Sequence, residues 1–160
     1  METGDAGPEA GSPTSPADPG KGPGYSLAPG HALDTFEMRP VEVAGADWAM
    51  EMEVTPQVVN SSGALQGGLL ATLVDMVAGT ALVRGEGAYA RTATSEMQIS
   101  FLAGARVGPV LATAQVLRRG RRSAVVRVDV RDRGAGNLHV AAATLTFAAR
   151  GGTDPPGSSS

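Results

Sequence analysis

A single carboxylate within an apolar segment is the feature of this sequence best suited to chemistry. Asp75 lies within residues 67–84, where nearly every other side chain is apolar or small. An ionised acid is costly in such surroundings, so Asp75 must be hydrogen-bonded, paired or functional. A partly desolvated carboxylate can attack a carbonyl carbon or act as a general base on water. The competing interpretation is a helix acid that is capped by its neighbours or paired with a second chain.

Small and polar residues precede Asp75 where a helix is expected to begin. Gly67 and Gly68 stand at that start, where backbone N–H groups lack intrahelical partners and lie at the positive end of the helix dipole. Such an N–H could polarise a carbonyl oxygen, and a glycine permits the close approach this needs. Asn60 could orient a water molecule or the carbonyl. The alternative for all three residues is a tight turn into the helix, because Asn and Gly are common turn residues.

The spacing of these residues resembles a family signature. It is similar to that of the PaaI-like (phenylacetate-type) hotdog acyl-CoA thioesterases, within the 4-hydroxybenzoyl-CoA thioesterase superfamily, and the resemblance extends over residues 36–147. The matching positions are Asn60, Gly63, Gly67, Gly68 and Asp75. Gln66 departs from the pattern, since the family usually has His there. Glutamine can donate and accept hydrogen bonds, but it does not titrate as His does.

The resemblance implies hydrolysis of an acyl-CoA or acyl-carrier-protein thioester, with no metal or other cofactor. Asp75 would attack the thioester or activate water, while the Gly67 N–H would polarise the thioester carbonyl. Asn60 and Gln66 would position the reacting groups, and Gly68 would contact the substrate.

The resemblance also implies active sites shared between the subunits of a homodimer or homotetramer. Thr94 aligns with a Ser or Thr that lies close to the carboxylate and comes from the neighbouring subunit; the alternative is an ordinary sheet threonine. Two other functions stay open. One is a hotdog module that binds acyl-CoA without hydrolysing it, an interpretation that Gln66 favours. The other is a structural or assembly role in which the polar tails recruit partners.

Four arginines surround one glycine in the segment RRGRR. They are Arg118, Arg119, Arg121 and Arg122. Arg119, Arg121 and Arg122 could bind the phosphates of CoA, because a guanidinium suits bidentate contacts with phosphate. A solvated hairpin turn is an equally good interpretation. A nucleic-acid patch is disfavoured because no aromatic residues are interleaved.

The elements that must position these residues can be read from the apolar periodicity. An amphipathic helix is expected over about 67–84, with its core face formed by Leu69, Leu70, Leu73, Val74, Val77 and Ala81. Alternation predicts a half-buried strand from Trp48 to Pro56 and further strands near 92–101, 110–117, 124–131 and 138–147. Residues 33–43 fit either a short helix or a first strand. One strand, one long helix and then an antiparallel meander predict an α+β hotdog fold, in which the sheet wraps a central helix.

Composition narrows the remaining choices of partner, metal site and cellular location. The chain has 160 residues, 42% hydrophobic content and a formal charge of −3, which suits one domain and gives no reason to expect nucleic acid as the main partner. No cysteine and only two histidines argue against disulfides and a histidine-rich metal site. No membrane span or signal peptide is apparent, so we expect a cytoplasmic protein. Residues 1–30 and 150–160 are expected to be disordered tails around a hotdog domain at 31–149.

Overall fold

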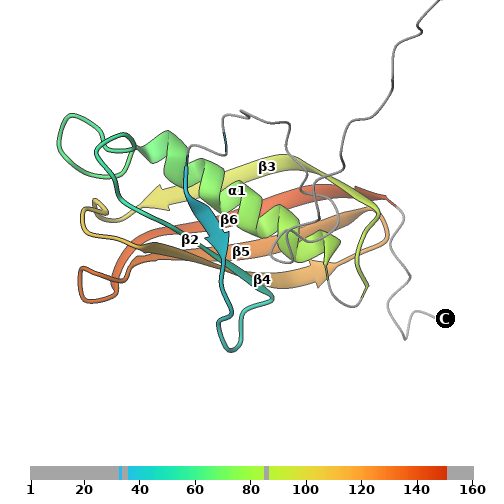
Figure 1. Ribbon diagram of the computed structural model, residues 1–160. Coiled ribbons are helices and arrows are strands. Elements are labelled where there is room, and N and C mark those ends of the chain that lie inside the picture. The colour runs from blue at the N-terminus through green and yellow to red at the C-terminus, as the bar shows by residue number, and fades with distance from the viewer. Residues whose placement is uncertain (1–32, 34–35, 85–86, 151–160) are drawn as a thin grey trace, which may run out of the picture.

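One helix lies across one face of a single antiparallel sheet (Figure 1). The computed structural model describes residues 33, 36–84 and 87–150. Its elements are β1 (Met38–Pro40), β2 (Trp48–Met52), α1 (Gly67–Val83), β3 (Arg91–Phe101), β4 (Val110–Arg119), β5 (Ser123–Asp132) and β6 (Leu138–Arg150). The predicted α+β class and central helix are confirmed, and the segment at 33–43 contributes a short strand. The predicted tails, apart from Arg150 at the end of β6, lie outside the described residues.

The sheet order differs from the predicted meander. The strands run β1-β2-β4-β5-β6-β3, so β4, β5 and β6 form a meander while β3 crosses over to pair with β6 at the far edge. Residues 102–109 make this crossover. Alternation of side chains identifies a strand but does not specify its partner, which explains why the position of β3 was predicted wrongly.

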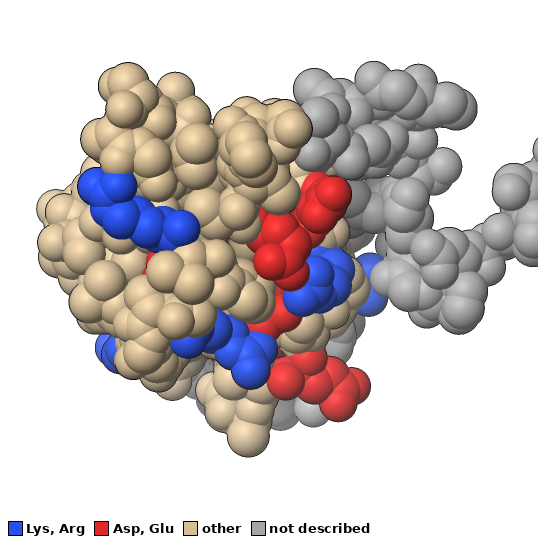
Figure 2. All heavy atoms as spheres, turned by 60° about the vertical axis from the view of Figure 1, so that its left-hand side comes forward, with Lys and Arg blue, Asp and Glu red and all other residues tan. Residues whose placement is uncertain are grey.

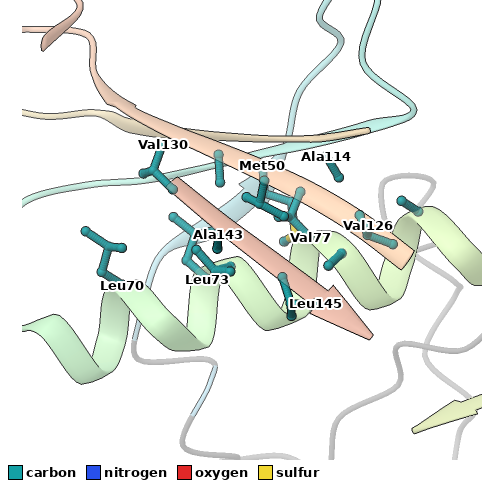
Figure 3. Close-up of a cluster of buried hydrophobic side chains, with 14 of the residues drawn as sticks. Met50, Leu70, Leu73, Val77, Ala114, Val126, Val130, Ala143 and Leu145 are labelled. Carbon is teal, nitrogen blue, oxygen red and sulfur yellow. The ribbon is translucent and has the colours of Figure 1, made fainter. Parts of the chain in front are cut away.

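The core lies between α1 and the helix-facing side of the sheet (Figure 3). Leu70, Leu73 and Val77 of the helix are buried against valines and alanines that alternate along β4, β5 and β6. The predicted core face of the helix is confirmed except at Leu69, which is only partly buried. Many of the sheet positions are alanine, such as Ala112 and Ala143. These short side chains let the helix backbone approach the sheet closely.

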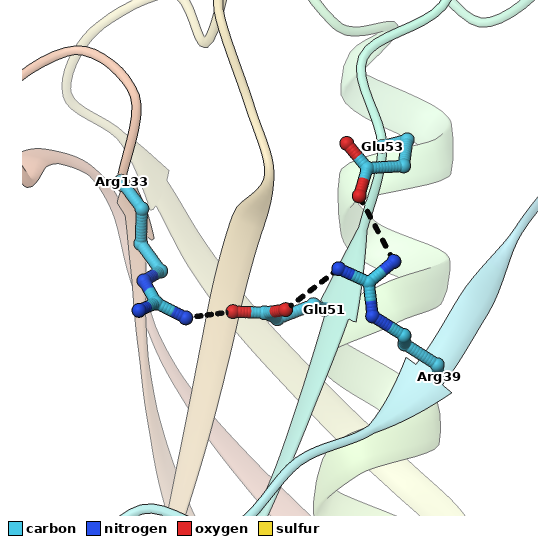
Figure 4. Close-up of polar contacts among 4 residues, drawn as sticks. All are labelled: Arg39, Glu51, Glu53 and Arg133. Carbon is cyan, nitrogen blue, oxygen red and sulfur yellow. Dashed lines mark hydrogen bonds and ion pairs between the residues drawn. The ribbon is translucent and has the colours of Figure 1, made fainter.

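The prediction that β2 is half-buried and runs to Pro56 is wrong. The strand ends at Met52, and Ala49 and Glu51 are buried along with Met50 and Met52, so both faces of the strand are covered. Glu51 tolerates this burial because it lies between two guanidinium groups (Figure 4). Arg39 of β1 contacts it at 3.0 Å, and Arg133 reaches it from the turn after β5. A buried acid with two cationic partners is compatible with a folded core.

Charges of both signs are mixed on the face of the molecule shown in Figure 2, where acidic and basic side chains lie next to one another. Besides Glu51, Arg39 contacts Glu53 at 2.9 Å. Within the residues that the structure describes, no helix is long and apolar enough to cross a membrane.

Candidate active site

Asp75 lines a hollow between α1 and β3, which we call the Asp75 hollow. Its volume is about 250 Å³, and its lining residues are Asp75, Met76, Gly79, Thr80, Val83, Thr92, Thr94 and Phe147. Thr94 Oγ1 donates a hydrogen bond of 2.6 Å to Asp75 Oδ1. The register of β3 against β6 shifts between Thr94 and Glu96, an irregularity of the kind that re-aims side chains. Thr94 therefore contacts the carboxylate of its own chain, rather than that of a neighbouring subunit as the resemblance implied.

The first turn of α1 leaves backbone donors open. Gln66 is the N-cap residue, and its carbonyl accepts the N–H groups of Leu69 and Leu70, both at 3.0 Å. No hydrogen bond within the described residues uses the N–H of Gly67 or Gly68. The Gln66 side chain is exposed and makes no capping hydrogen bond. A Cβ added at Gly68 would meet nothing within 4 Å, so open space lies beside this turn.

Asn60 shapes the loop that leads into the helix. Its Oδ1 accepts hydrogen bonds from the backbone N–H of Ser62 at 2.9 Å, the Ser62 hydroxyl at 2.7 Å and the backbone N–H of Ala64 at 3.2 Å. The loop is closed by a bond of 2.8 Å from the Asn60 N–H to the Ala64 carbonyl. The side-chain oxygen is thus committed to the turn, and the Nδ2 amide is the part of Asn60 suited to contact a substrate.

Asn60 and Gly67 share a second hollow, which we call the helix-start hollow. It measures about 390 Å³, and Phe101 and Arg106 also line it. Asp75 does not line this hollow, and Gly67 does not line the Asp75 hollow. At a rise of about 1.5 Å per residue, Gly67 and Asp75 are separated by about 12 Å along the helix axis. The chain thus brings Asn60 to Gly67 and Thr94 to Asp75, but it keeps these two pairs apart.

Asp132 supports one wall of the helix-start hollow, a role that the sequence analysis missed. This buried carboxylate accepts the backbone N–H groups of Arg106 at 2.8 Å, Val107 at 3.0 Å and Gly108 at 2.8 Å in the loop after β3. It also accepts the N–H of Ala135 at 3.2 Å. Burial alone would raise the pKa of Asp132, but these four backbone donors outweigh it and hold the pKa below its usual value.

The loop held by Asp132 also contacts the turn that contains Asn60. The Leu65 N–H donates to the Ala105 carbonyl at 2.7 Å, and the Arg106 guanidinium donates to the Ser62 carbonyl. Gly134 permits the close packing on the other side, because a Cβ there would overlap the Gly108 carbonyl oxygen. An aspartate at a strand end next to a glycine-containing turn was the available signal. The sequence analysis treated that turn only as a hairpin.

The four arginines of the β4–β5 hairpin have different surroundings. Arg119 donates to the carbonyls of Ala81 at 2.7 Å and Leu82 at 3.0 Å, and its guanidinium lies 5.7 Å from the centroid of the Tyr89 ring. It therefore caps the C-terminal end of α1, where a cation is favourable. Arg121 and Arg122 line a third hollow of about 900 Å³ together with Arg91, which the sequence analysis did not select. We call it the arginine hollow.

The arginine hollow borders the Asp75 hollow, because Thr92 lines both. The two hollows thus meet at β3.

Comparison with known proteins agrees with this architecture. The family model described as Thioesterase superfamily matches residues 62–138. Acyl-coenzyme A thioesterase 13 from Mus musculus is 36% identical over 89 residues, which cover 55% of this chain and 63% of that protein. The chain spans about three fifths of the length of the curated relatives that it matches, 60% in the Caenorhabditis elegans protein F42H10.6.

Solved structures give the same result. The crystal structure of zebra fish thioesterase superfamily member 2 matches with a TM-score of 0.67 and 31% identity, over 78% of this chain and 88% of that one. The Bacillus halodurans protein BH2602, solved with CoA, matches with a TM-score of 0.55 and 25% identity, over 63% of this chain and 66% of that one. The chain belongs to the thioesterase superfamily, and the hotdog fold is confirmed.

Proposed function

We propose that this protein hydrolyses an acyl-CoA or acyl-carrier-protein thioester at Asp75. The observation that carries the proposal is the 2.6 Å hydrogen bond from Thr94 Oγ1 to Asp75 Oδ1 in the Asp75 hollow. This bond fixes one carboxylate oxygen and leaves Oδ2 to act on a substrate. The mouse relative is named an acyl-coenzyme A thioesterase, and BH2602 was crystallised with CoA, which supports CoA as the thiol.

Two chemical routes fit the carboxylate. As a general base, Asp75 takes a proton from water while the water oxygen attacks the thioester carbon, and the thiolate then leaves and is protonated. As a nucleophile, Asp75 attacks the thioester carbon and expels the thiolate, which is then protonated, and water hydrolyses the resulting mixed anhydride to the free acid and the Asp75 carboxylate. In both routes the negative charge that develops on the carbonyl oxygen needs a donor, and the open N–H of Gly67 supplies it. The Asn60 amide and Gln66 position the reacting groups, and Gly68 contacts the substrate.

The donor and the carboxylate must come from different subunits, because one chain keeps them about 12 Å apart. Strand β3 lies at the end of the sheet and has an unpaired outer edge within the described residues. A long exposed edge of this kind is a template for pairing with a second copy. A two-fold axis through paired β3 strands would set two α1 helices antiparallel. If that axis passes near residue 71 of both helices, Gly67 of one copy and Asp75 of the other lie at the same height along the two helix axes.

A subunit-mixing experiment tests the shared site. Gly67→Pro removes the N–H and keeps the local backbone, because proline is tolerated at the first helical position and Gln66 already has a backbone compatible with a following proline. It also adds a ring beside Phe101. Gly67→Pro and Asp75→Asn homodimers should each be nearly inactive. Random mixing should restore about one quarter of the wild-type activity, because half of the dimers are mixed and each of these has one intact site.

Gly67→Ala serves as the control for this experiment. It keeps the N–H, and its Cβ would lie 3.6 Å from the Phe101 ring, an ordinary contact. It should lose less activity than Gly67→Pro. Mixtures that stay as inactive as their parent variants would contradict the shared site.

The arginine hollow is the proposed site for CoA phosphates, with Arg121 and Arg122 as predicted and Arg91 in place of Arg119. Replacing Arg121 and Arg122 by Gln should raise KM about tenfold or more and change kcat little. The charge-assisted contacts to phosphate that are lost would be equally strong in the bound substrate and in the transition state. Arg118→Gln is the matched control, since Arg118 is on the same hairpin but does not line the hollow. An equal change in KM for the control variant would contradict a specific site.

Thiol release from a panel of aliphatic and aromatic acyl-CoAs tests the activity itself. Turnover with any member supports a thioesterase. A folded protein that binds CoA esters and releases no thiol would instead be the non-catalytic acyl-CoA-binding module, the alternative that Gln66 favours.

A further inference from the structure

Arg106 is an exposed cation at the helix-start hollow, and no acidic side chain of the described residues pairs with it. The ion pairs among those residues do not include Arg106. Its side chain makes one hydrogen bond within them, to the Ser62 carbonyl. Because a guanidinium carries several N–H donors, donors of Arg106 remain for a ligand.

Two glycines place the guanidinium of Arg106 on the wall of this hollow. A Cβ at Gly104 would lie 3.6 Å from Nε and 3.7 Å from Nη2, and a Cβ at Gly63 would lie 3.5 Å from Nη1. Arg106, Gly104 and Ser62 all line the hollow. The backbone of Arg106 is held by Asp132, whose carboxylate accepts its N–H at 2.8 Å and contacts other backbone donors rather than the guanidinium. The cation is thus fixed at its base and open to the hollow at its end.

Apart from this cation, the lining of the hollow carries no charge and is largely apolar. Leu65, Leu70 and Phe101 contribute to it. Phe101 is 56% exposed, and its ring would lie 3.6 Å from a Cβ at Gly67, so an accessible aromatic surface lies beside the start of the helix. The volume of about 390 Å³ is within the range of small-molecule sites, about 300–1,000 Å³. An apolar wall with one cation suits a ligand that has an apolar body and an anionic end.

We propose that the helix-start hollow holds the acyl group of the substrate and that Arg106 selects acyl groups that end in a carboxylate. The inference rests on the proposed function, in which the Gly67 N–H binds the thioester oxygen and the arginine hollow binds the CoA phosphates. With the oxygen at Gly67 and the phosphates bound elsewhere, the acyl group is the part of the substrate that remains to fill this hollow. Its methylene groups pack against Leu65, Leu70 and Phe101, and its terminal carboxylate accepts N–H groups of the guanidinium. The substrate class is then the half-thioesters of dicarboxylic acids.

Paired substrates test this selectivity. Acyl-CoAs of increasing chain length that end in a carboxylate are each compared with the terminal amide of the same length, which has nearly the same shape and no charge. At the best length the wild type should prefer the acid about tenfold in kcat/KM, the lower range expected for a hydrogen bond to a charged group. The preference should shrink as the salt concentration rises, because the guanidinium is exposed to solvent.

Variants of Arg106 assign the preference to its guanidinium. In Arg106→Gln the ratio of acid to amide should fall to about one, whereas Arg106→Lys keeps the charge and should retain part of the preference. Arg131→Gln is the matched control, because Arg131 also donates to a backbone carbonyl, that of Asn137 at 3.1 Å, but does not line the hollow. It should keep the wild-type ratio. If Arg106→Gln weakens the acid and the amide equally, Arg106 contacts the CoA part of the substrate or only supports its loop, and the inference is overturned.

A binding measurement separates this inference from the proposed function. CoA thioethers that carry the same terminal carboxylate or amide cannot be hydrolysed, so the ratio of their Kd values reports recognition even if the protein has no thioesterase activity. Absence of turnover would overturn the proposed function alone. A Kd ratio of about one for the wild type at every chain length, or an acid preference that persists in Arg106→Gln, would overturn the role of Arg106.

Discussion

Replacing Asp75 by Asn is expected to lower kcat for thioester hydrolysis by about 10²–10⁴-fold, the range of general acid–base catalysis. Asparagine has the same shape, and its Oδ1 can still accept the hydrogen bond from Thr94 Oγ1. The substitution thus removes the nucleophile or base while it keeps the local contact. The measurement is thiol release at saturating acyl-CoA, together with the Kd of a CoA thioether for each protein.

Thr94→Val is the matched comparison for this variant. It removes the hydroxyl that orients the carboxylate but leaves the carboxylate itself, so its loss of kcat should be much smaller than that of Asp75→Asn. An Asp75→Asn protein that binds the thioether normally and keeps its kcat would exclude Asp75 as the catalytic group. A covalent acyl adduct on Asp75 after rapid quenching would favour nucleophilic attack over general-base catalysis.

The second large effect is expected at Asp132, where Ala should reduce the free energy of unfolding by about 3–5 kcal/mol, as for other buried charges whose partners are left unpaired. The substitution leaves four backbone N–H groups without their acceptor, three of them in the loop at 106–108. Urea denaturation with a two-state fit measures this difference.

Asp129→Ala provides the control on the same strand. Asp129 is partly exposed and contacts Arg127 at 3.5 Å and His139 at 3.2 Å, and exposed ion pairs of the Arg127 kind contribute about 0–1 kcal/mol. Equal losses of stability for Asp129→Ala and Asp132→Ala would contradict the special role of the buried acid.

Acidification should also lower the stability of the folded protein through Asp132. The pKa of Asp132 is lower in the folded protein than the ordinary value of about 3.9. Its contribution to stability is therefore fully present above that value and is lost as the pH falls through the folded pKa. As the pH falls below about 4, wild-type stability should decrease more steeply than that of Asp132→Asn, which cannot titrate at this position.

The sequence predicted well those features of the fold that depend on adjacent residues, and it missed features that depend on distant partners. The limits of α1 and the β4–β5 and β5–β6 hairpins were predicted closely, because helical periodicity and glycine-containing turns are properties of adjacent residues. The position of β3 and the burial of Glu51 depend on partners far away in the chain. A rule based on alternation therefore could not supply them.

The candidate site shows the same division. An acid in an apolar helix drew attention to Asp75, but its spacing from Asn60 and Gly67, which matches the resemblance, made it the candidate. Thr94 was also selected through the resemblance. The sequence did not indicate that Arg119 is occupied by the carbonyls at the end of α1, or that Arg91 lies beside Arg121. Arginines in a hairpin look equivalent in sequence, and their different roles arise only from the helix end that packs against one of them.

The alanines that line the sheet beneath α1 have a consequence for how this protein can vary. Ala112, Ala114 and Ala141 are each no more than 1% exposed. Enlarging any of them forces the helix away from the sheet, and overpacking of this kind typically costs about 1–3 kcal/mol. Leucine-for-methionine exchanges at the larger core positions preserve volume and cost less. The smallest side chains are therefore the least replaceable in this core. Substitutions that the fold tolerates should occur mainly at the larger core residues.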